Sequence, residues 1–298
     1  MPPEVPVSSR RTRQRLPAHQ TKPSPQISSI AVQIAEYASK VRQTSKQRIK
    51  PLPNHLSRKS TGLTKKQLEI ANSKQELLKI RETPNVKNAT RATLAFAQVQ
   101  AGTAVCISPT GLLLTCAHCL AETPEEYDSD EVHCLIFAAG ILVQARCVSF
   151  DWKRDLALLQ ITASQPWGVS VGGDYDFPYI RLSKASPKLH EKLVCIGHPA
   201  GEQLEGVCKS KMTGFDVLHI SIGKFRGLAS GQDAHDNAEI GALMHNCWTY
   251  WGHSGAPLVS QTSGELVGLH SSWDTKNGMR RGIALEVILK FLSVAATD

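Results

Sequence analysis

From about position 92 to the C-terminus, the chain consists of short apolar or alternating segments separated by turn residues. Alternation with a period of two is typical of strands, and the segments Ser108-Pro109-Thr110-Gly111 and Asn277-Gly278 are typical of hairpin turns. We expect strands near residues 93–100, 102–108, 111–116, 132–138, 141–149, 156–161, 179–183, 192–197, 216–222, 256–260, 264–270 and 281–285. One helix closes the chain, because Val287, Ile288 and Phe291 share a helical face. The pattern predicts an all-β fold, either a sandwich or a pair of barrels.

The first 91 residues differ from the rest in charge and composition. They carry 19 Lys/Arg and 5 Asp/Glu, a formal charge of +14, whereas residues 92–298 carry 15 and 21, a formal charge of −6. Pro, Ser, Gln and Lys are frequent in this segment and aromatic side chains are few, so residues 1–26 are expected to be disordered. We therefore divide the chain into a basic, largely disordered N-terminal segment, 1–91, and a folded domain, 92–298.

Two short helices and an arginine cluster are expected within the basic segment. One helix is predicted in 27–43 and another from about 64 to 81, each with too little apolar surface to fold alone. The arginines at positions 10, 11, 13 and 15 have three functional interpretations: a nuclear targeting signal, an Arg-rich transit peptide, or an arm that binds nucleic acid or another acidic partner. A solvated tail without a partner is the simplest alternative.

No segment of the sequence has the pattern of a secretory signal or a membrane span. The first 30 residues lack an apolar core, and no run of about 18 apolar residues occurs anywhere. These absences predict an intracellular protein without a transmembrane segment, in the cytoplasm or nucleus, with the mitochondrion as the alternative.

The eight cysteines are expected to be free thiols. Several lie inside apolar segments, among them Cys106 and Cys195, where a thiol behaves as a small hydrophobic group. A reducing compartment also disfavours disulfides. Cys116 and Cys119, with His118 between them, can suggest zinc ligands, but no second cysteine pair at zinc-site spacing accompanies them. We therefore predict neither a metal site nor a cofactor.

Ser254 stands on a glycine-flanked turn immediately before an apolar run. Glycines let the backbone turn sharply, so the N–H groups of Gly252 and Ser254 are candidates for an oxyanion hole. A serine nucleophile needs a base, and the base needs a carboxylate that orients it. His118, at the end of one apolar run, and Asp155, at the start of another, can take these roles, although Asp151 competes with Asp155.

In their order along the chain, these segments resemble the trypsin-like (chymotrypsin-fold) serine peptidases, particularly the HtrA-like branch, over about residues 93–295. The matching segments are Gly102-Thr103-Ala104-Val105, Gly111-Leu112-Leu113-Leu114-Thr115-Cys116-Ala117-His118, Arg154-Asp155-Leu156-Ala157-Leu158-Leu159, Val194-Cys195-Ile196-Gly197-His198-Pro199-Ala200-Gly201, Gly252-His253-Ser254-Gly255-Ala256-Pro257-Leu258, Gly264-Glu265-Leu266-Val267-Gly268-Leu269-His270 and Gly282-Ile283-Ala284-Leu285. The resemblance implies two six-stranded antiparallel β-barrels and a C-terminal helix, with His118, Asp155 and Ser254 in the cleft between the barrels. It also implies a peptidase domain that hydrolyses protein or peptide substrates through an acyl-enzyme.

The chain departs from the family pattern near the serine. His253 replaces the usual Asn or Asp, and Ala256 replaces the usual second Gly, a change that we expect to be tolerated because alanine is small. The cysteine that pairs with Cys119 in secreted relatives has no counterpart near Ala101, so Cys119 is expected to be a free thiol. The sequence also predicts that no PDZ module follows the core.

Thr249 and His270 are candidates for the S1 pocket, which receives the side chain of the residue whose carbonyl is attacked (P1). Thr249 lies five residues before Ser254, and His270 lies sixteen residues after it. This is similar to glutamyl endopeptidases of the same fold, and partly to viral 3C-type proteases, in which a Thr and a His line S1. Both side chains can donate hydrogen bonds to a carboxylate or carboxamide. The resemblance implies cleavage after Glu, with Gln or Asp as further P1 residues; alternatively, His270 only packs inside the second barrel.

Two other functions fit parts of the sequence. A catalytically weak protease fold can serve as a binding protein, tethered to nucleic acid or an acidic partner by the basic segment. A lipase-type hydrolase needs a G-x-S-x-G elbow and the histidine last in the chain, whereas here Gly255 follows Ser254 directly and His118 comes first. The serine endopeptidase is the function that the sequence favours, and the binding protein is the alternative.

Overall fold

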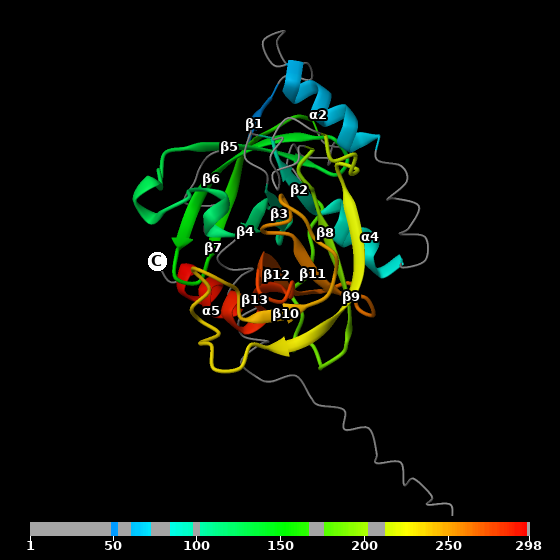
Figure 1. Cartoon of the computed structure of the whole chain (residues 1–298). Helices are drawn as coiled ribbons and strands as arrows, with labels where there is room; N and C mark the ends of the chain where they lie inside the picture. The colour runs from blue at the N-terminus through cyan, green and yellow to red at the C-terminus, as the bar shows by residue number, and fades with distance from the viewer. Residues whose placement is uncertain are drawn as a thin grey trace, which may run out of the picture.

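The computed structural model of the chain describes residues 49–52, 61–72, 84–97, 102–166, 176–201 and 212–296. These residues form two closed six-stranded β-barrels, accompanied by a few short helices (Figure 1). The all-β fold and the pair of barrels predicted from the sequence are therefore confirmed.

The first barrel is built from strands in the first half of the domain. They are β2 (Thr93–Phe96), β3 (Thr103–Cys106), β4 (Leu112–Thr115), β5 (Val132–Phe137), β6 (Leu142–Asp151) and β7 (Leu156–Ser164). Their order is β7-β4-β3-β2-β5-β6, and pairing of β6 with β7 closes the barrel. Every residue of β2, β3 and β4 is buried. Their sequences are therefore largely apolar runs and do not alternate between apolar and polar residues.

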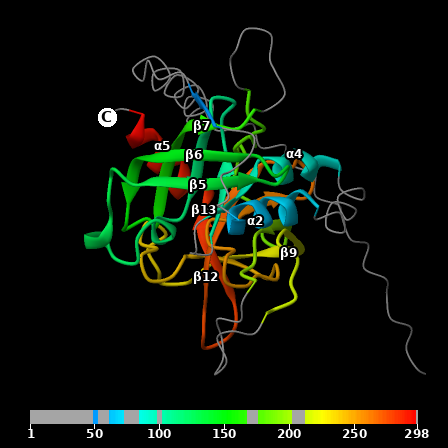
Figure 2. The same ribbon diagram turned by 90° about the horizontal axis from the view of Figure 1, so that it is seen from above.

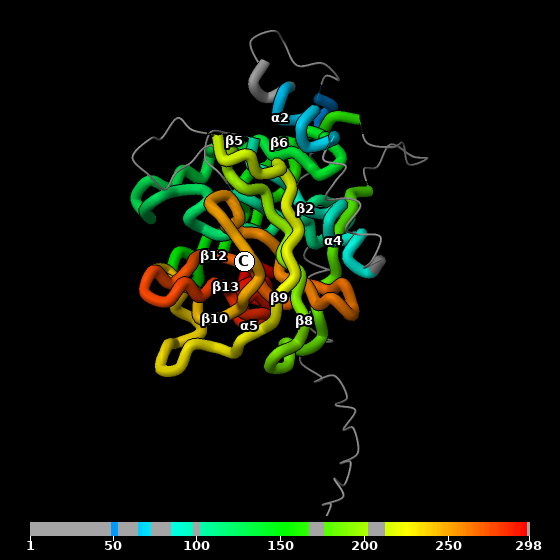
Figure 3. The backbone as a smooth tube through the Cα atoms, turned by 45° about the vertical axis from the view of Figure 1, so that its right-hand side comes forward, coloured from blue at the N-terminus to red at the C-terminus, as the bar shows by residue number. Residues whose placement is uncertain are grey.

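The second barrel contains the remaining strands and the C-terminal helix. They are β8 (Lys192–Gly197), β9 (His219–Leu228), β10 (Leu243–His245), β11 (Pro257–Ser260), β12 (Leu266–Trp273), β13 (Arg280–Ala284) and α5 (Leu285–Ala295). The barrel closes in the order β10-β13-β12-β11-β8-β9, with β8 and β9 side by side (Figure 3). α5 buries Val287, Ile288 and Phe291, the face that the sequence predicted.

Two segments differ from the strands expected. Residues 179–183 form no regular strand, and only Leu182 makes an isolated bridge, to Leu266. β10 was not expected, because three residues are too few to show a period in the sequence. The helix expected in 27–43 and the disorder expected in 1–26 lie outside the described residues.

Parts of the segment before residue 92 pack against the first barrel. β1 (Lys50–Pro51) pairs in parallel with β7, and α2 (Thr61–Ala71), which begins three residues before the helix expected at 64, lies beside β5 (Figure 2). Ile70 is fully buried, and the amide of Gln67 donates to the Gly140 carbonyl (3.0 Å) and to Gln165 Oε1 (2.8 Å). The 3-10 turn Pro84–Val86 and α4 (Lys87–Arg91) then lead into β2.

The helices of the described part of the chain are short. None of them is both long and apolar enough to cross a membrane.

The burial of Ile70 gives a direct test of how α2 docks. We expect Ile70→Ala to lower the free energy of unfolding by about 2–3 kcal/mol, because it removes a buried side chain and leaves a cavity between α2 and the barrel. Leu68 lies on the same helix but is 59% exposed, so Leu68→Ala should change stability by less than about 0.5 kcal/mol. Urea unfolding followed by circular dichroism measures both; equal effects would mean that α2 does not dock as described.

Candidate active site

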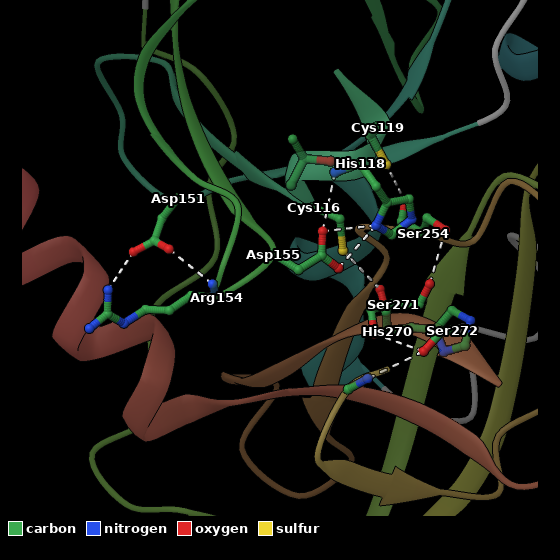
Figure 4. Close-up of polar contacts among 12 residues, drawn as sticks. Cys116, His118, Cys119, Asp151, Arg154, Asp155, Ser254, His270, Ser271 and Ser272 are labelled. Atoms are coloured by element: carbon green, nitrogen blue, oxygen red, sulfur yellow. Dashed lines mark hydrogen bonds and ion pairs between the residues drawn. The ribbon is translucent and has the colours of Figure 1, made fainter. Parts of the chain in front are cut away.

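Strand pairing in the first barrel brings His118 and Asp155 together. His118 lies in the 3-10 turn Ala117–Cys119 after β4, and Asp155 immediately precedes β7. Because β4 and β7 are antiparallel neighbours, with Thr115 opposite Ala157, the end of one lies beside the start of the other. His118 Nδ1 is 2.8 Å and 3.0 Å from the two carboxylate oxygens of Asp155 (Figure 4).

The surroundings of this pair favour a basic imidazole. The Asp155 side chain is only 4% exposed, and it also accepts the backbone N–H of His118 (3.1 Å). Burial alone would lower the pKa of His118, but the charge and hydrogen bond of Asp155 outweigh burial, and the pKa is raised. His118 remains 35% exposed toward the cleft, so a basic nitrogen faces solvent while the carboxylate is held behind it.

Asp151, the alternative carboxylate, belongs to a different contact. It accepts the backbone N–H of Arg154 (2.9 Å) and forms an ion pair with the Arg154 guanidinium (Figure 4). Asp155, in contrast, adopts a left-handed backbone conformation with φ of 54°, which is uncommon for residues other than glycine although Asp tolerates it better than most. Such strain is concentrated at functional sites, where the surrounding structure holds it in place.

The serine turn depends on two glycines in the left-handed region. Gly252 has φ of 95° and Gly255 has φ of 80°. A Cβ atom on Gly255 would lie 2.0 Å from the Thr103 carbonyl oxygen, and one on Gly252 would lie 2.3 Å from the His198 carbonyl oxygen. Ala256, where relatives carry glycine, is fully buried without a positive φ, so its methyl group is accommodated as expected.

His118, Asp155 and Ser254 line one cleft of about 350 Å³. The Ser254 hydroxyl donates to the carbonyl of Ser271 (3.1 Å), and the structure shows no hydrogen bond from it to His118. Among the described residues, no protein acceptor engages the backbone N–H groups of Gly252 and Ser254. The predicted base, nucleophile and oxyanion donors are thus gathered at one place, with the serine turned toward Ser271.

Thr103 connects the first barrel to the serine turn, a role that the sequence analysis missed. Its backbone N–H donates to the Ser254 carbonyl (2.8 Å), and its hydroxyl donates to the Gly252 carbonyl (2.7 Å). The same hydroxyl accepts the backbone N–H of His198 (3.1 Å). With both carbonyls held by Thr103, the peptide groups of the turn are fixed. The only signal in the sequence was the resemblance of its segment to a family strand.

The His253 ring packs against β8 at Gly197, a residue without a side chain. Its Nδ1 lies 3.0 Å from the Tyr250 carbonyl oxygen, and its ring centroid lies 5.6 Å from that of Trp248. A Cβ atom on Gly197 of β8 would lie 2.4 Å from the His253 ring. The unusual histidine and the glycine of the Ile196-Gly197 segment therefore depend on each other sterically.

Thr249 and His270 line adjoining spaces. His270 lies in the cleft that contains Ser254, with Nδ1 at 3.0 Å from His245 Nε2, whereas Thr249 lines a neighbouring cavity of about 500 Å³. Burial, followed by the influence of His245 and other neighbours, lowers the pKa of His270 well below its ordinary value, so its imidazole is neutral near pH 7. The Thr249 hydroxyl is buried and has no hydrogen-bond partner among the described residues.

The seven cysteines within the described residues are free, as expected, including Cys119. Among the described residues, one group of possible metal ligands includes the predicted base His118: the donor atoms of Cys116, His118 and Asp155 lie within 4.8 Å of one another. Burial raises the pKa of the Cys116 thiol well above its ordinary value, and Asp155 is already engaged by His118. A cysteine binds zinc as a thiolate, and these three residues include no fourth ligand, so the group is better explained by the His118–Asp155 pair than by a structural zinc site.

Comparison with known proteins identifies the family. The model of the trypsin-like peptidase domain matches residues 102–269, more than half of the chain, so the chain belongs to the trypsin-like peptidases. No curated protein sequence matches it. Among solved structures, the serine endoprotease from Yersinia pestis is similar, with a TM-score of 0.51, 20% identity, and coverage of 72% of this chain and 66% of that one. The chain thus spans just under two thirds of that protein's length, and at this identity the likeness concerns the fold.

The buried histidines predict a loss of stability in acid. Burial, as the main cause, lowers the pKa of His198 to about 4 and the pKa values of His245 and His253 to about 3. An unfolded histidine has a pKa of about 6.5, so the unfolded state binds more protons below that pH and the free energy of unfolding falls as the pH falls. His118, with its raised pKa, acts in the opposite direction, but several groups with lowered pKa values, His270 among them, outweigh one.

A single substitution tests whether protonation of a buried histidine lowers the free energy of unfolding in acid. Between pH 6.5 and 4, His198 should contribute about 3 kcal/mol to the loss of stability, so His198→Gln should flatten the pH dependence of the free energy of unfolding. His235 is exposed, and His235→Gln is the matched control that should leave the curve unchanged. Urea titrations at several pH values measure both. An unaltered slope in His198→Gln would show that this ring is not kept neutral by folding.

Proposed function

We propose that the protein is a serine endopeptidase in which Ser254 attacks the peptide carbonyl, His118 accepts the serine proton, and Asp155 orients His118. The observation that carries the proposal is the His118–Asp155 pair at 2.8 Å in the same cleft as Ser254. Membership of the trypsin-like peptidases supports the same chemistry.

The first chemical step requires a rotation of the Ser254 side chain. When its hydroxyl leaves the Ser271 carbonyl and turns toward His118 Nε2, the imidazole can take the proton while the serine oxygen bonds to the substrate carbonyl carbon. The Ser271 carbonyl then becomes free to accept an N–H of the substrate backbone. Apo enzymes commonly show such loose geometry before substrate binds.

The following steps use the same groups. The negative oxygen of the tetrahedral intermediate is stabilised by the free N–H groups of Gly252 and Ser254. His118 returns its proton to the leaving amine, which breaks the peptide bond and leaves an acyl-enzyme on Ser254. Water, activated by His118, then hydrolyses the ester and releases the acid.

For the P1 residue we propose Glu, with Gln or Asp as further possibilities. His270 lies in the catalytic cleft, and if His245 Nε2 donates to its Nδ1, the proton of His270 is on Nε2 and available to a substrate oxygen. Thr249 offers a buried hydroxyl without a partner. Two polar groups of this kind favour a polar P1 side chain, because an apolar one would leave them unsatisfied.

A fluorophosphonate probe tests whether the catalytic groups assemble. The wild-type chain should become covalently labelled at Ser254, because only an activated serine attacks the probe. Ser254→Ala should abolish labelling and should lower kcat for peptide cleavage by about 10³-fold or more. Mass spectrometry of the labelled peptide identifies the modified residue. A folded wild type that does not react would instead favour the binding protein tethered through its basic N-terminal segment.

A library of peptides that vary only at P1 tests the substrate preference. We expect kcat/KM for Glu to exceed that for Leu or Lys by at least about tenfold, the value of one good hydrogen bond to a charged group. Cleavage is followed by fluorescence and the cleaved bond is located by mass spectrometry. A preference for Arg, Lys or Leu would contradict the assignment of Thr249 and His270 while leaving the peptidase mechanism intact.

A further inference from the structure

The cavity beside the catalytic cleft is placed to receive a substrate side chain. It has a volume of about 500 Å³ and lies between the residues preceding the serine turn and the β12–β13 hairpin. Tyr250, Trp273 and Thr275 line both this cavity and the cleft that contains Ser254, so the two spaces adjoin. A side chain held near Ser254 can therefore extend past these residues into the larger space.

Arg280, the first residue of β13, supplies a positive charge to this cavity. Its guanidinium donates to the carbonyls of Gly278 (2.9 Å) and Thr249 (3.3 Å), which hold it at the cavity wall. Among the described residues it has no acidic partner within ion-pair distance, and its buried Nε has no hydrogen-bond partner. Carbonyl groups offset only part of a full charge, so a partly buried cation without a carboxylate is left incompletely compensated.

The remaining polar groups of the cavity leave room for a carboxylate. The Thr249 hydroxyl, on a residue only 2% exposed, is a second unsatisfied donor. Asp274 is the one acid among the lining residues, but its carboxylate oxygens accept the backbone N–H of Lys276 (2.9 Å) and the amide of Asn277 (3.0 Å) within its own turn. A hydroxyl and a guanidinium fork together match the acceptor pattern of a carboxylate.

Arg280 also resolves a weakness in a pocket made of Thr249 and His270 alone. The His270 imidazole is neutral, and the positive charge of Arg280 is one of the causes that lower its pKa, after burial and the neighbouring histidines. Neutral donors bind a carboxamide nearly as well as a carboxylate, so they discriminate weakly between Gln and Glu. A fixed cation favours the anion, because hydrogen bonds between charged groups are about twice as strong as neutral ones.

We propose that Arg280 is the residue that makes this pocket select a carboxylate, rather than a carboxamide, in the P1 side chain of the substrate. The inference rests on the proposed peptidase function for the identity of the ligand as a peptide. It goes beyond that function by assigning the charge that separates Glu and Asp from Gln.

Binding to the inactive full-length Ser254→Ala chain tests the inference without requiring catalysis. Two peptides that differ only in Glu or Gln at P1 are titrated, and the fluorescence of Trp248 and Trp273, which line the cavity, reports binding. We expect the Glu peptide to bind about 10- to 100-fold more tightly, the range of a charge-assisted hydrogen bond. Adding Arg280→Gln should bring the two Kd values together, whereas Arg280→Lys should retain part of the preference because it keeps the charge.

Lys276→Gln is the matched control. It removes one positive charge from the exposed tip of the same hairpin without lining the cavity, so it should leave the Glu:Gln ratio unchanged. The ratio within each variant is insensitive to general damage, and thermal unfolding shows which variants fold. Equal binding of the two peptides by the Ser254→Ala chain, no binding of either, or a preference that survives Arg280→Gln would each overturn the inference. Failure of the peptidase mechanism would show separately, as absent fluorophosphonate labelling of the wild type.

Discussion

The architecture of the site depends on the hydrogen bonds by which Thr103 of the first barrel holds the serine turn of the second. Its N–H and hydroxyl engage the carbonyls of Ser254 and Gly252, whereas the N–H groups of these two residues have no acceptor in the part of the chain that the structure describes. Gly255 is pressed against the Thr103 carbonyl so closely that a side chain there would collide with it. In the proposed mechanism, a charge that develops on a substrate oxygen meets donors that are fixed before the reaction begins, and such donors stabilise the charge most effectively.

Three histidines in the second barrel are buried and neutral, and they pack near the serine turn. His245, His253 and His270 are buried together, and their ring centroids lie 5.2 Å (His245–His270) and 6.4 Å (His253–His270) apart. Burial removes the charge of each ring and leaves directional donors and acceptors in a low-dielectric interior. Arg280, at the cavity wall, is close enough to His245 and His270 to help lower their pKa values, after burial as the main cause. In the second barrel, the neutral histidines thus provide directional hydrogen-bonding groups, whereas Arg280 provides the positive charge.

Local patterns located His118, Asp155 and Ser254 in the sequence because His118 follows a short apolar strand and the other two precede one, where turn residues mark the boundary. These patterns alone left Asp151 as a competitor, and the resemblance to a family motif favoured Asp155. The pairing of β4 with β7, which no local pattern contains, places Asp155 beside His118. β10 was too short to show a period, and Arg280 reads in the sequence as an ordinary surface charge. Long-range pairing places these residues, so a single sequence cannot show what they contact.

The residues of the proposed active site are divided between the two barrels, and this division matters while the chain folds. The imidazole and carboxylate belong to one barrel, and the alcohol and its anion-stabilising peptide groups belong to the other. In the proposed mechanism, a folding intermediate with only one barrel formed contains either the base and its carboxylate or the nucleophile, but not both. The proposed catalytic set is therefore complete only once the two barrels have docked.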